Sequence, residues 1–140
     1  MKKLVLFDVD KTLIQGSKVK DDLAYPEAFK KVYGVDTSIE IIGHAGMTDQ
    51  QIIIDVMKKN GLDEQTIKAK LKECAKALID SFNKNIGGEE IILMDGVKEL
   101  LEALNKKRVL MGLVTGNLEP IARTELKKAG INKYVKNHPS

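Results

Sequence analysis

The sequence predicts an α/β fold in which parallel strands are separated by an inserted module of α-helices. Two observations support this class. An apolar run that ends in two carboxylates, residues 4–10, and a continuous apolar run, residues 109–114, are typical of buried parallel strands, and residues 21–88 between them show helical periodicity without a strand pattern. Polar side chains follow both runs, and open α/β sheets bind ligands at the carboxyl ends of their strands. We therefore expect a functional site where these two strands end.

The first strand, residues 4–10, ends in two carboxylates. Side chains two residues apart project to the same side of an extended chain, so Asp8 and Asp10 are expected to crowd together. Like charges this close repel each other unless a cation or a shared proton relieves them. With the Thr12 hydroxyl nearby in sequence, the pattern predicts a site for Mg²⁺ and a phosphate. The alternative is a helix cap or a solvated turn.

Three helices are predicted in the following module, over residues 21–33, 49–59 and 63–84. The second should begin after Thr48, because Thr48 and Gln51 have the spacing of a capping box. The third shows apolar side chains along one face, and these are Ile67, Leu71, Cys74, Ala75, Leu78 and Phe82. Cysteine occurs once in the chain, so no intrachain disulfide is expected, and its place in this face predicts a reduced core residue.

The α/β pattern resumes after Gly87 and Gly88. A helix is predicted after Asp95-Gly96, with four apolar side chains on one side: Val97, Leu100, Leu101 and Leu104. The continuous apolar run 109–114 predicts a strand that is buried on both faces of a parallel sheet. Residues 131–135 indicate one further short strand.

Thr115-Gly116-Asn117 turns sharply from the second strand into a helix that has Pro120 in its first turn and Gly130 as its stop. The start of a helix offers backbone N–H groups and a positive dipole end to an anion. Because adjacent parallel strands end at the same edge, we expect Thr115 to lie near the two carboxylates. The alternative role for Thr115 is an N-cap hydroxyl.

These motifs resemble those of the haloacid dehalogenase (HAD) superfamily. Asp8-Val9-Asp10-Lys11-Thr12 resembles its first motif, DxDxT, and Leu113-Val114-Thr115-Gly116-Asn117 resembles its second, a hydrophobic strand ending in Thr or Ser. The segment Gly43-His44-Ala45-Gly46-Met47-Thr48-Asp49 is similar to the GxxxGxTD segment in the caps of phosphoglycolate-phosphatase-like members. The resemblance covers nearly the whole chain.

The resemblance implies a partial Rossmann-like core, formed by residues 1–15 and 90–140 and incomplete at its C-terminal end. Residues 16–89 would form a helical cap of the C1 type, inserted directly after the first motif. A third-motif lysine and fourth-motif acids are missing from the pattern, so the chain is expected to be truncated before both. Lys136 in Val135-Lys136-Asn137-His138-Pro139 distantly resembles the third motif but comes too early in the chain.

By resemblance, the function is a Mg²⁺-dependent phosphatase of small phosphorylated metabolites, phosphoglycolate-like, and impaired in a truncated chain. Asp8 would be the nucleophile that forms an aspartyl-phosphate intermediate, and Asp10 the general acid and base. Both would hold Mg²⁺. An acid at position 10 fits phosphoryl transfer, because dehalogenases of the superfamily usually have a non-acidic residue there.

The resemblance also implies which residues bind the substrate. The phosphoryl oxygens would be bound by Thr115, Gly116 and Asn117. Thr48 and Asp49 would belong to a cap loop that closes over the rest of the substrate, and the alternative for them is a helix N-cap. Lys11 departs from the glycine that is common at its position, and either points to solvent or alters substrate choice.

Two other functions compete with a phosphatase. One is a non-catalytic remnant of the fold that binds phosphate or a protein partner. The other is a phospho-receiver domain, which is disfavoured because receivers pair adjacent acids at the first strand and lack the helical module. The chain has 140 residues, 43% hydrophobic and 4% aromatic. Its small core with an unpaired sheet edge predicts self-association, as an edge-paired or swapped homodimer.

Charge and targeting signals exclude some partners. The formal net charge is only +3, and the lysines are scattered rather than clustered with aromatic side chains, so no nucleic-acid partner is expected. No signal-peptide pattern and no stretch long enough to span a bilayer is present. We therefore expect a cytoplasmic protein that does not act at a membrane.

Overall fold

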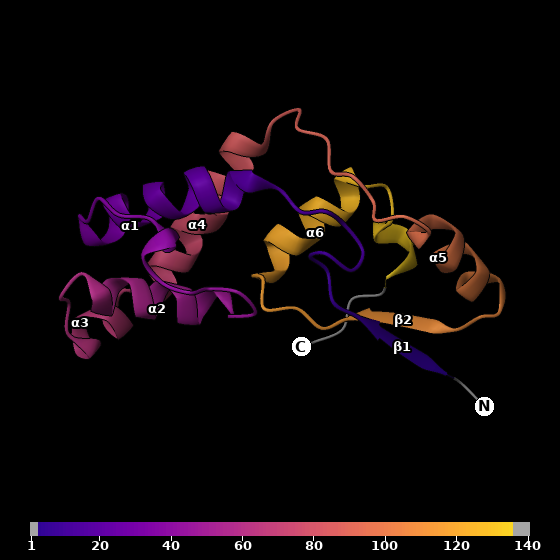
Figure 1. Ribbon diagram of the computed structural model, residues 1–140, viewed down its shortest axis with the longest axis horizontal. Coiled ribbons are helices and arrows are strands. Elements are labelled where there is room, and N and C mark those ends of the chain that lie inside the picture. Colours follow the sequence, from indigo (N-terminus) through magenta and orange to yellow (C-terminus); the bar gives the residue numbers. More distant parts are fainter. Residues whose placement is uncertain (1–2, 136–140) are drawn as a thin grey trace. The chain divides into compact units, whose positions relative to one another are not determined.

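A computed structural model describes residues 3–135 of the chain (Figure 1). The chain forms two compact units. The first, here called the core unit, consists of Met1–Ser17, Glu89–Thr115 and Ala122–Ser140, and the second, the helical unit, of Lys18–Gly88 and Gly116–Ile121. Unlike the ranges expected from the sequence, these units place residues 116–121 with the helices. Independent domains with the predicted boundaries stay a prediction.

The core unit contains two parallel strands, β1 (Leu4–Phe7) and β2 (Leu110–Leu113), which lie side by side in Figure 1. Leu4 pairs with Leu110 and Phe7 pairs with Leu113. Beyond the last pair, the Val114 N–H donates to the Phe7 carbonyl at 2.8 Å. Both strands therefore end at the same edge of the sheet, and the predicted class, a parallel α/β core with an inserted helical module, is confirmed.

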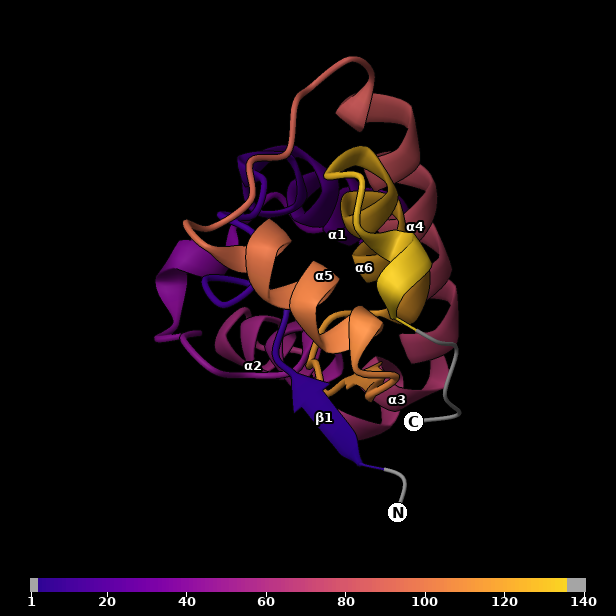
Figure 2. The same cartoon turned by 90° about the vertical axis from the view of Figure 1, so that its right-hand side faces the viewer.

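One face of this sheet is uncovered by the part of the chain that the structure describes. Met111 is only 2% exposed, whereas Leu4, Leu6, Leu110 and Val114 are exposed by 54%, 53%, 40% and 57%. The helix α5 (Val97–Lys106) lies beside the sheet in both views (Figures 1 and 2). The prediction that the second strand is buried on both faces is wrong for the described residues, because they supply a cover on one face only.

The first strand ends at Phe7, three residues earlier than expected, because the chain then folds back on itself. The Val9 carbonyl accepts hydrogen bonds from the N–H groups of Leu13 and Ile14, at 2.9 and 3.2 Å. In addition, the Lys11 N–H donates to the Ile14 carbonyl at 2.7 Å. The side chains of Val9, Leu13 and Ile14 are buried, so apolar burial as well as hydrogen bonding holds this loop.

The helical unit is built from one π-helical turn, η1 (Lys20–Ala24), one 3₁₀ turn, η2 (Ile39–Ile41), and α-helices. The α-helices are α1 (Tyr25–Tyr33), α2 (Asp49–Lys59), α3 (Glu64–Ala69) and α4 (Leu71–Ile86). Their inward faces share aliphatic and aromatic side chains that are fully buried, among them Phe29, Ile53, Met57, Ile67, Cys74, Leu78 and Phe82. Helices α1 and α4 pack together, as Figure 1 shows.

The long helix predicted over residues 63–84 is two helices. The Asp63 carboxylate caps α3 by accepting from the Thr66 N–H at 2.7 Å, and the helix ends at Lys70, whose φ and ψ are −112° and 10°. Helix α4 begins directly afterwards, and the buried side chains Ile67 and Cys74 lie on either side of the break. Cys74 is buried as predicted, and burial, followed by the nearby Glu73, raises the pKa of its thiol to about 12. The thiol therefore stays protonated at neutral pH.

After β2 the chain forms α6 (Glu119–Lys128) and ends its described part in a 3₁₀ turn, η3 (Asn132–Tyr134). The strand predicted over 131–135 is therefore wrong. Here the Arg123 side chain donates to the Asn132 side chain at 3.1 Å and to the Val135 carbonyl at 2.9 Å, which holds the turn against α6. Lys136 lies outside the described residues. Among the described helices, none has the length and apolar character that a membrane span requires.

Candidate active site

Two of the predicted site residues follow the ends of paired strands. Asp8 comes directly after β1, and Thr115 comes two residues after β2. The pairing of Phe7 with Leu113 fixes both strand ends to one edge of the sheet. This edge is the place where parallel sheets of α/β proteins bind ligands. The register therefore brings together the backbone from which Asp8 and Thr115 project.

The loop after β1 presents the two carboxylates differently. Asp8 is exposed, and one of its oxygens accepts from the Val9 N–H at 2.8 Å. Asp10 is half-buried beside Gly16, where an added Cβ would lie 3.4 Å from the Asp10 Oδ1. Gly16 also has a φ of +81°, a conformation that favours glycine. An exposed carboxylate on a strand end can reach a phosphorus atom, and the half-buried one is held close to its own loop.

Lys11 adopts a left-handed backbone conformation, with a φ of +63°. This is the position where the sequence has a lysine in place of the glycine common among the proteins that it resembles. We expect Lys11→Gly to stabilise the folded chain by about 1 kcal/mol, because a residue with a Cβ costs roughly 1–2 kcal/mol in this conformation and glycine loses part of that gain to unfolded-state entropy. Urea unfolding measures the difference in the free energy of unfolding.

The matched control for this change is Lys107→Gly. Lys107 carries the same side chain at the end of α5, but its φ is −81°, which any residue adopts. Here glycine should lower the free energy of unfolding by about 0.5–1 kcal/mol. A Lys11→Gly chain that unfolds at a lower urea concentration than the unchanged chain would contradict the expected relief of strain.

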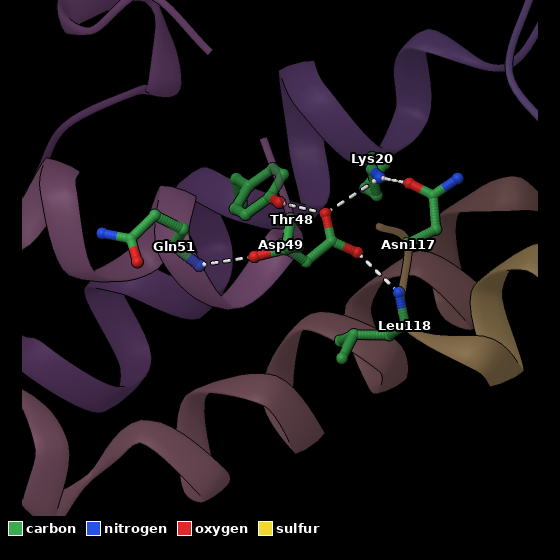
Figure 3. A network of polar contacts seen from close by, with 7 residues as sticks. Lys20, Thr48, Asp49, Gln51, Asn117 and Leu118 are labelled. Atoms are coloured by element: carbon green, nitrogen blue, oxygen red, sulfur yellow. Dashed lines mark hydrogen bonds and ion pairs between the residues drawn. The ribbon is translucent and has the colours of Figure 1, made fainter. Parts of the chain in front are cut away.

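Within the helical unit, a clasp of hydrogen bonds joins residues 116–118 to the helices (Figure 3). The Asp49 N–H donates to the Gly116 carbonyl at 2.9 Å, and the Asp49 Oδ2 accepts from the Leu118 N–H at 2.8 Å. The Asp49 Oδ1 accepts from the Tyr25 hydroxyl and lies 3.0 Å from the Lys20 Nζ. The Lys20 ammonium also donates to the Asn117 side chain. Six residues of three chain segments thus form one polar network.

The charged pair of this network is largely buried. The side chain of Asp49 is 2% exposed and that of Lys20 is 13% exposed. Burial, and then the neighbouring Asp49 carboxylate, raise the pKa of Tyr25 far above its ordinary value, so its hydroxyl stays protonated and donates. A buried carboxylate needs such donors, because an uncompensated charge in the interior is costly.

Gly116 lets the two segments of the clasp approach each other. A Cβ at this position would lie 3.0 Å from the Thr48 Cα and 3.2 Å from the Met47 carbonyl oxygen. Both neighbours are backbone atoms, which cannot swing aside as a side chain can. The residue that the sequence suggested for phosphate binding therefore also has a packing role, which any side chain would disturb.

Thr48 and Asp49 stand at the start of α2. The Thr48 hydroxyl oxygen accepts from the Gln51 N–H at 3.1 Å, so the predicted cap is confirmed (Figure 3). Direct contact of either residue with a substrate stays a prediction. His44 lies 3.5 Å from the Glu40 carboxylate, on the loop before this helix.

Sequence reasoning missed Lys20, Tyr25 and Leu118 as members of the network. Leu118 takes part only through its backbone N–H, which no side-chain pattern reveals. Lys20 is one of many lysines in a polar stretch, and the sequence contains no signal that it is buried. Tyr25 is the one member that the sequence could have indicated, because a tyrosine on the inner face of a helix needs a polar partner for its hydroxyl.

The sequence model of the family described as "Haloacid dehalogenase-like hydrolase" matches residues 5–137. The chain belongs to this family. Its HAD membership agrees with the two motifs at the strand ends and with the helical module between them. Among proteins of curated function, none matches the chain.

Solved structures share the fold of this HAD chain. A predicted phosphoglycolate phosphatase from Haemophilus somnus is 24% identical, with a TM-score of 0.60, over 96% of this chain and 60% of that protein. A HAD hydrolase of family IA, variant 3, from Entamoeba histolytica is 22% identical, with a TM-score of 0.58, over 97% and 58%. CbbY from Rhodobacter sphaeroides in complex with phosphate is 18% identical, with a TM-score of 0.58, over 91% and 57%.

At these identities the similarity shows the HAD fold alone. The chain spans about three fifths of the length of each of these structures, while nearly all of it is matched. Each of them thus contains further residues that have no counterpart in this chain.

Proposed function

We propose that this chain carries the nucleophile and the acid/base group of a Mg²⁺-dependent phosphatase that acts on small phosphorylated metabolites. The observation that carries the proposal is the strand register, which places Asp8 and Thr115 after the ends of the paired strands β1 and β2. A carboxylate and a hydroxyl residue at one sheet edge suit a phosphate ester. Family membership supports hydrolase chemistry, and the similarity to a predicted phosphoglycolate phosphatase supports a phosphoglycolate-like substrate.

Asp8 is the proposed nucleophile because its carboxylate is exposed at the strand end. One of its oxygens forms a bond to phosphorus while the ester bond from phosphorus to the leaving oxygen breaks. Asp10 donates a proton to that leaving oxygen, so an alcohol departs and an aspartyl-phosphate remains. Asp10 then accepts a proton from the water that attacks phosphorus, which releases inorganic phosphate and restores Asp8.

The donors at this edge fit Mg²⁺, which is commonly held in proteins by one or two carboxylates together with water and substrate phosphate oxygens. Asp8 and Asp10 are the proposed ligands. Among the described residues there is no cluster of three or more acidic, histidine or cysteine side chains that could hold a metal by itself. When bound, the ion would neutralise charge on the phosphoryl group.

Thr115, Gly116 and Asn117 are the proposed phosphate-binding residues. A hydroxyl and consecutive backbone N–H groups before a helix suit the oxygens of a phosphoryl group. Asn117 is half-buried and its side-chain oxygen is engaged by Lys20, so its backbone is the part proposed to face the ligand.

A second function, non-catalytic binding of phosphate or of a partner, is favoured by the number of carboxylates at the site. Two carboxylates without a third metal-binding side chain among the described residues suffice for binding phosphate with a cation, and such binding requires no hydrolysis. The two functions share the site and differ in turnover.

Hydrolysis of p-nitrophenyl phosphate separates these functions. We expect the chain to release p-nitrophenol with Mg²⁺ present, and removal of the ion with EDTA to lower the rate by about 10²-fold or more, since the ion neutralises charge that develops in the transition state. Adding Mg²⁺ back should restore the rate. A rate equal to that of buffer, together with saturable binding of inorganic phosphate in calorimetry, would support the second function instead.

We also propose that the chain self-associates through its two-stranded sheet, with a second copy as the partner. Within residues 3–135 each strand has one edge that pairs with no other strand, and one sheet face exposes four large aliphatic side chains: Leu4, Leu6, Leu110 and Val114. Uncovered edges and apolar patches favour association. A second copy offers the same edge and the same patch, so the contact is self-complementary.

A further inference from the structure

Both carboxylate oxygens of Asp49 are engaged inside the protein. The Oδ2 atom accepts from the Leu118 N–H, while the Oδ1 atom faces the Lys20 ammonium and the Tyr25 hydroxyl. With a side chain only 2% exposed, this carboxylate would have to give up a partner in order to touch a substrate. Its geometry instead favours a role inside the protein.

Outside the helices, the hydrogen bonds of this network all involve three consecutive residues, 116–118. Asp49 contacts Gly116 and Leu118 through hydrogen bonds at both ends of the tripeptide, and Lys20 contacts the side chain of Asn117 in the middle. The tripeptide is bonded directly to Thr115, the hydroxyl residue that follows β2. Whatever fixes the tripeptide also limits the conformations of Thr115.

We propose that Lys20 and Asp49 are positioning residues that fix the backbone of residues 116–118, and through it the groups that bind the phosphoryl oxygens. The catalytic part of this inference rests on the proposed function, whereas the positioning itself does not. Lys20 acts as the bridge because its ammonium joins the Asp49 carboxylate to the Asn117 side chain. Asp49 acts as the cap because its carboxylate accepts from a backbone N–H just before α6 begins.

The charge on Lys20 is what makes the clasp stable. Without it, Asp49 would remain buried with two neutral donors, and the loss of one partner from a buried ion pair is strongly destabilising for the contacts of the other. We therefore expect the hydrogen bond from Leu118 to weaken when Lys20 is replaced, although Leu118 and Lys20 do not touch. An arginine can keep the charge and both bonds.

The experiment compares Lys20→Met with Lys20→Arg by two readouts. Amide hydrogen exchange of Leu118, followed by NMR, should be about 10-fold or more faster in Lys20→Met than in the unchanged chain, and within about 3-fold of it in Lys20→Arg. In the p-nitrophenyl phosphate assay, Lys20→Met should lower kcat by about 10-fold or more with little change in KM, because misplaced groups cost more in the transition state than in substrate binding.

The matched control is Lys30→Met, which removes an exposed ion pair from the same unit. Lys30 lies 3.1 Å from Asp36, and their side chains are 61% and 82% exposed. Surface pairs of this kind contribute little, so both readouts should match those of the unchanged chain. If Lys20→Met fails to fold, Tyr25→Phe serves instead, since it removes one donor to Asp49 and keeps the ion pair. It should speed exchange at Leu118 by about 3-fold or more.

The outcomes separate the inference from the proposed function. If the unchanged chain shows no turnover, the phosphatase proposal fails, and faster exchange confined to residues 116–118 still supports positioning. If exchange at Leu118 stays unchanged in Lys20→Met, or rises equally throughout the helical unit, the inference is overturned. The same holds if turnover is normal in the unchanged chain and equally normal in Lys20→Met.

Discussion

Replacing Asp8 by asparagine should lower the turnover of p-nitrophenyl phosphate by at least about 10³-fold, because the amide cannot attack phosphorus and removal of a nucleophile is among the most damaging changes to an enzyme. Asparagine keeps the shape of the side chain and can still accept from the Val9 N–H, so the loop should be preserved. Initial rates with Mg²⁺ at saturating substrate measure the effect. Thermal unfolding checks that the fold is intact.

The control for Asp8→Asn is Asp22→Asn, an exposed carboxylate in η1 that has no place in the proposed chemistry. It should leave the rate unchanged. Mass spectrometry of acid-quenched reactions adds a direct test, because a phosphoryl group on residue 8 should be present in the unchanged chain and absent from the variant. Equal, measurable turnover by Asp8→Asn and the unchanged chain would remove Asp8 from the mechanism.

Leu6→Lys on β1 should weaken self-association by about 10²- to 10⁴-fold in Kd. Leu6 is 53% exposed on the uncovered sheet face, and burying one such side chain contributes about 1.5–3 kcal/mol, twice over in a symmetric pair. A lysine on a strand also opposes pairing at the sheet edge. Sedimentation over a range of concentrations gives the dissociation constant.

A matched control for this variant is Leu23→Lys. Leu23 is 48% exposed, but lies in η1 of the helical unit rather than on the sheet. Its replacement should leave the dissociation constant unchanged. A chain that sediments as a monomer at every concentration would refute self-association, and an equal loss with both variants would place the contact somewhere other than the sheet.

The class of fold could be predicted because it depends on local patterns. Apolar runs are a local signal that predicts where the strands lie. The cap at Thr48 is local as well, because its hydroxyl comes three residues before a backbone N–H that has no partner inside the helix. The break at Lys70 could not be predicted, because Ile67 and Cys74 keep the same helical phase on both sides of it. Periodicity reports which face is buried, and a short interruption in phase leaves that face unchanged.

The burial of the strands could not be predicted for a second reason. A continuous apolar run predicts burial on both faces only if other elements are available to cover them, and this depends on the whole chain rather than on the strand. Leu110 and Val114 therefore read as core residues in the sequence, yet they are exposed in the structure. They are exposed because the described part of the chain has no element that covers this face of the sheet.

The candidate site divides in the same way. That Asp8 and Thr115 follow two paired strands could be predicted from the two apolar runs. The clasp on residues 116–118 could not, since it joins Lys20 to Asn117 through a fold that brings distant segments together. Backbone donors such as the Leu118 N–H carry no signature in the sequence.

The clasp has a consequence for the order in which the protein assembles as it is synthesised. Leu118 bonds to a residue 69 positions earlier in the chain, and Asn117 to one 97 positions earlier. The helices between Lys18 and Gly88 can form from local contacts as they leave the ribosome, but their polar network stays open until the strand β2 and the tripeptide after it have been made. Lys20 and Asp49 therefore stay hydrated until residues 116–118 have been synthesised, and their contacts can lose water only once that later segment packs against them.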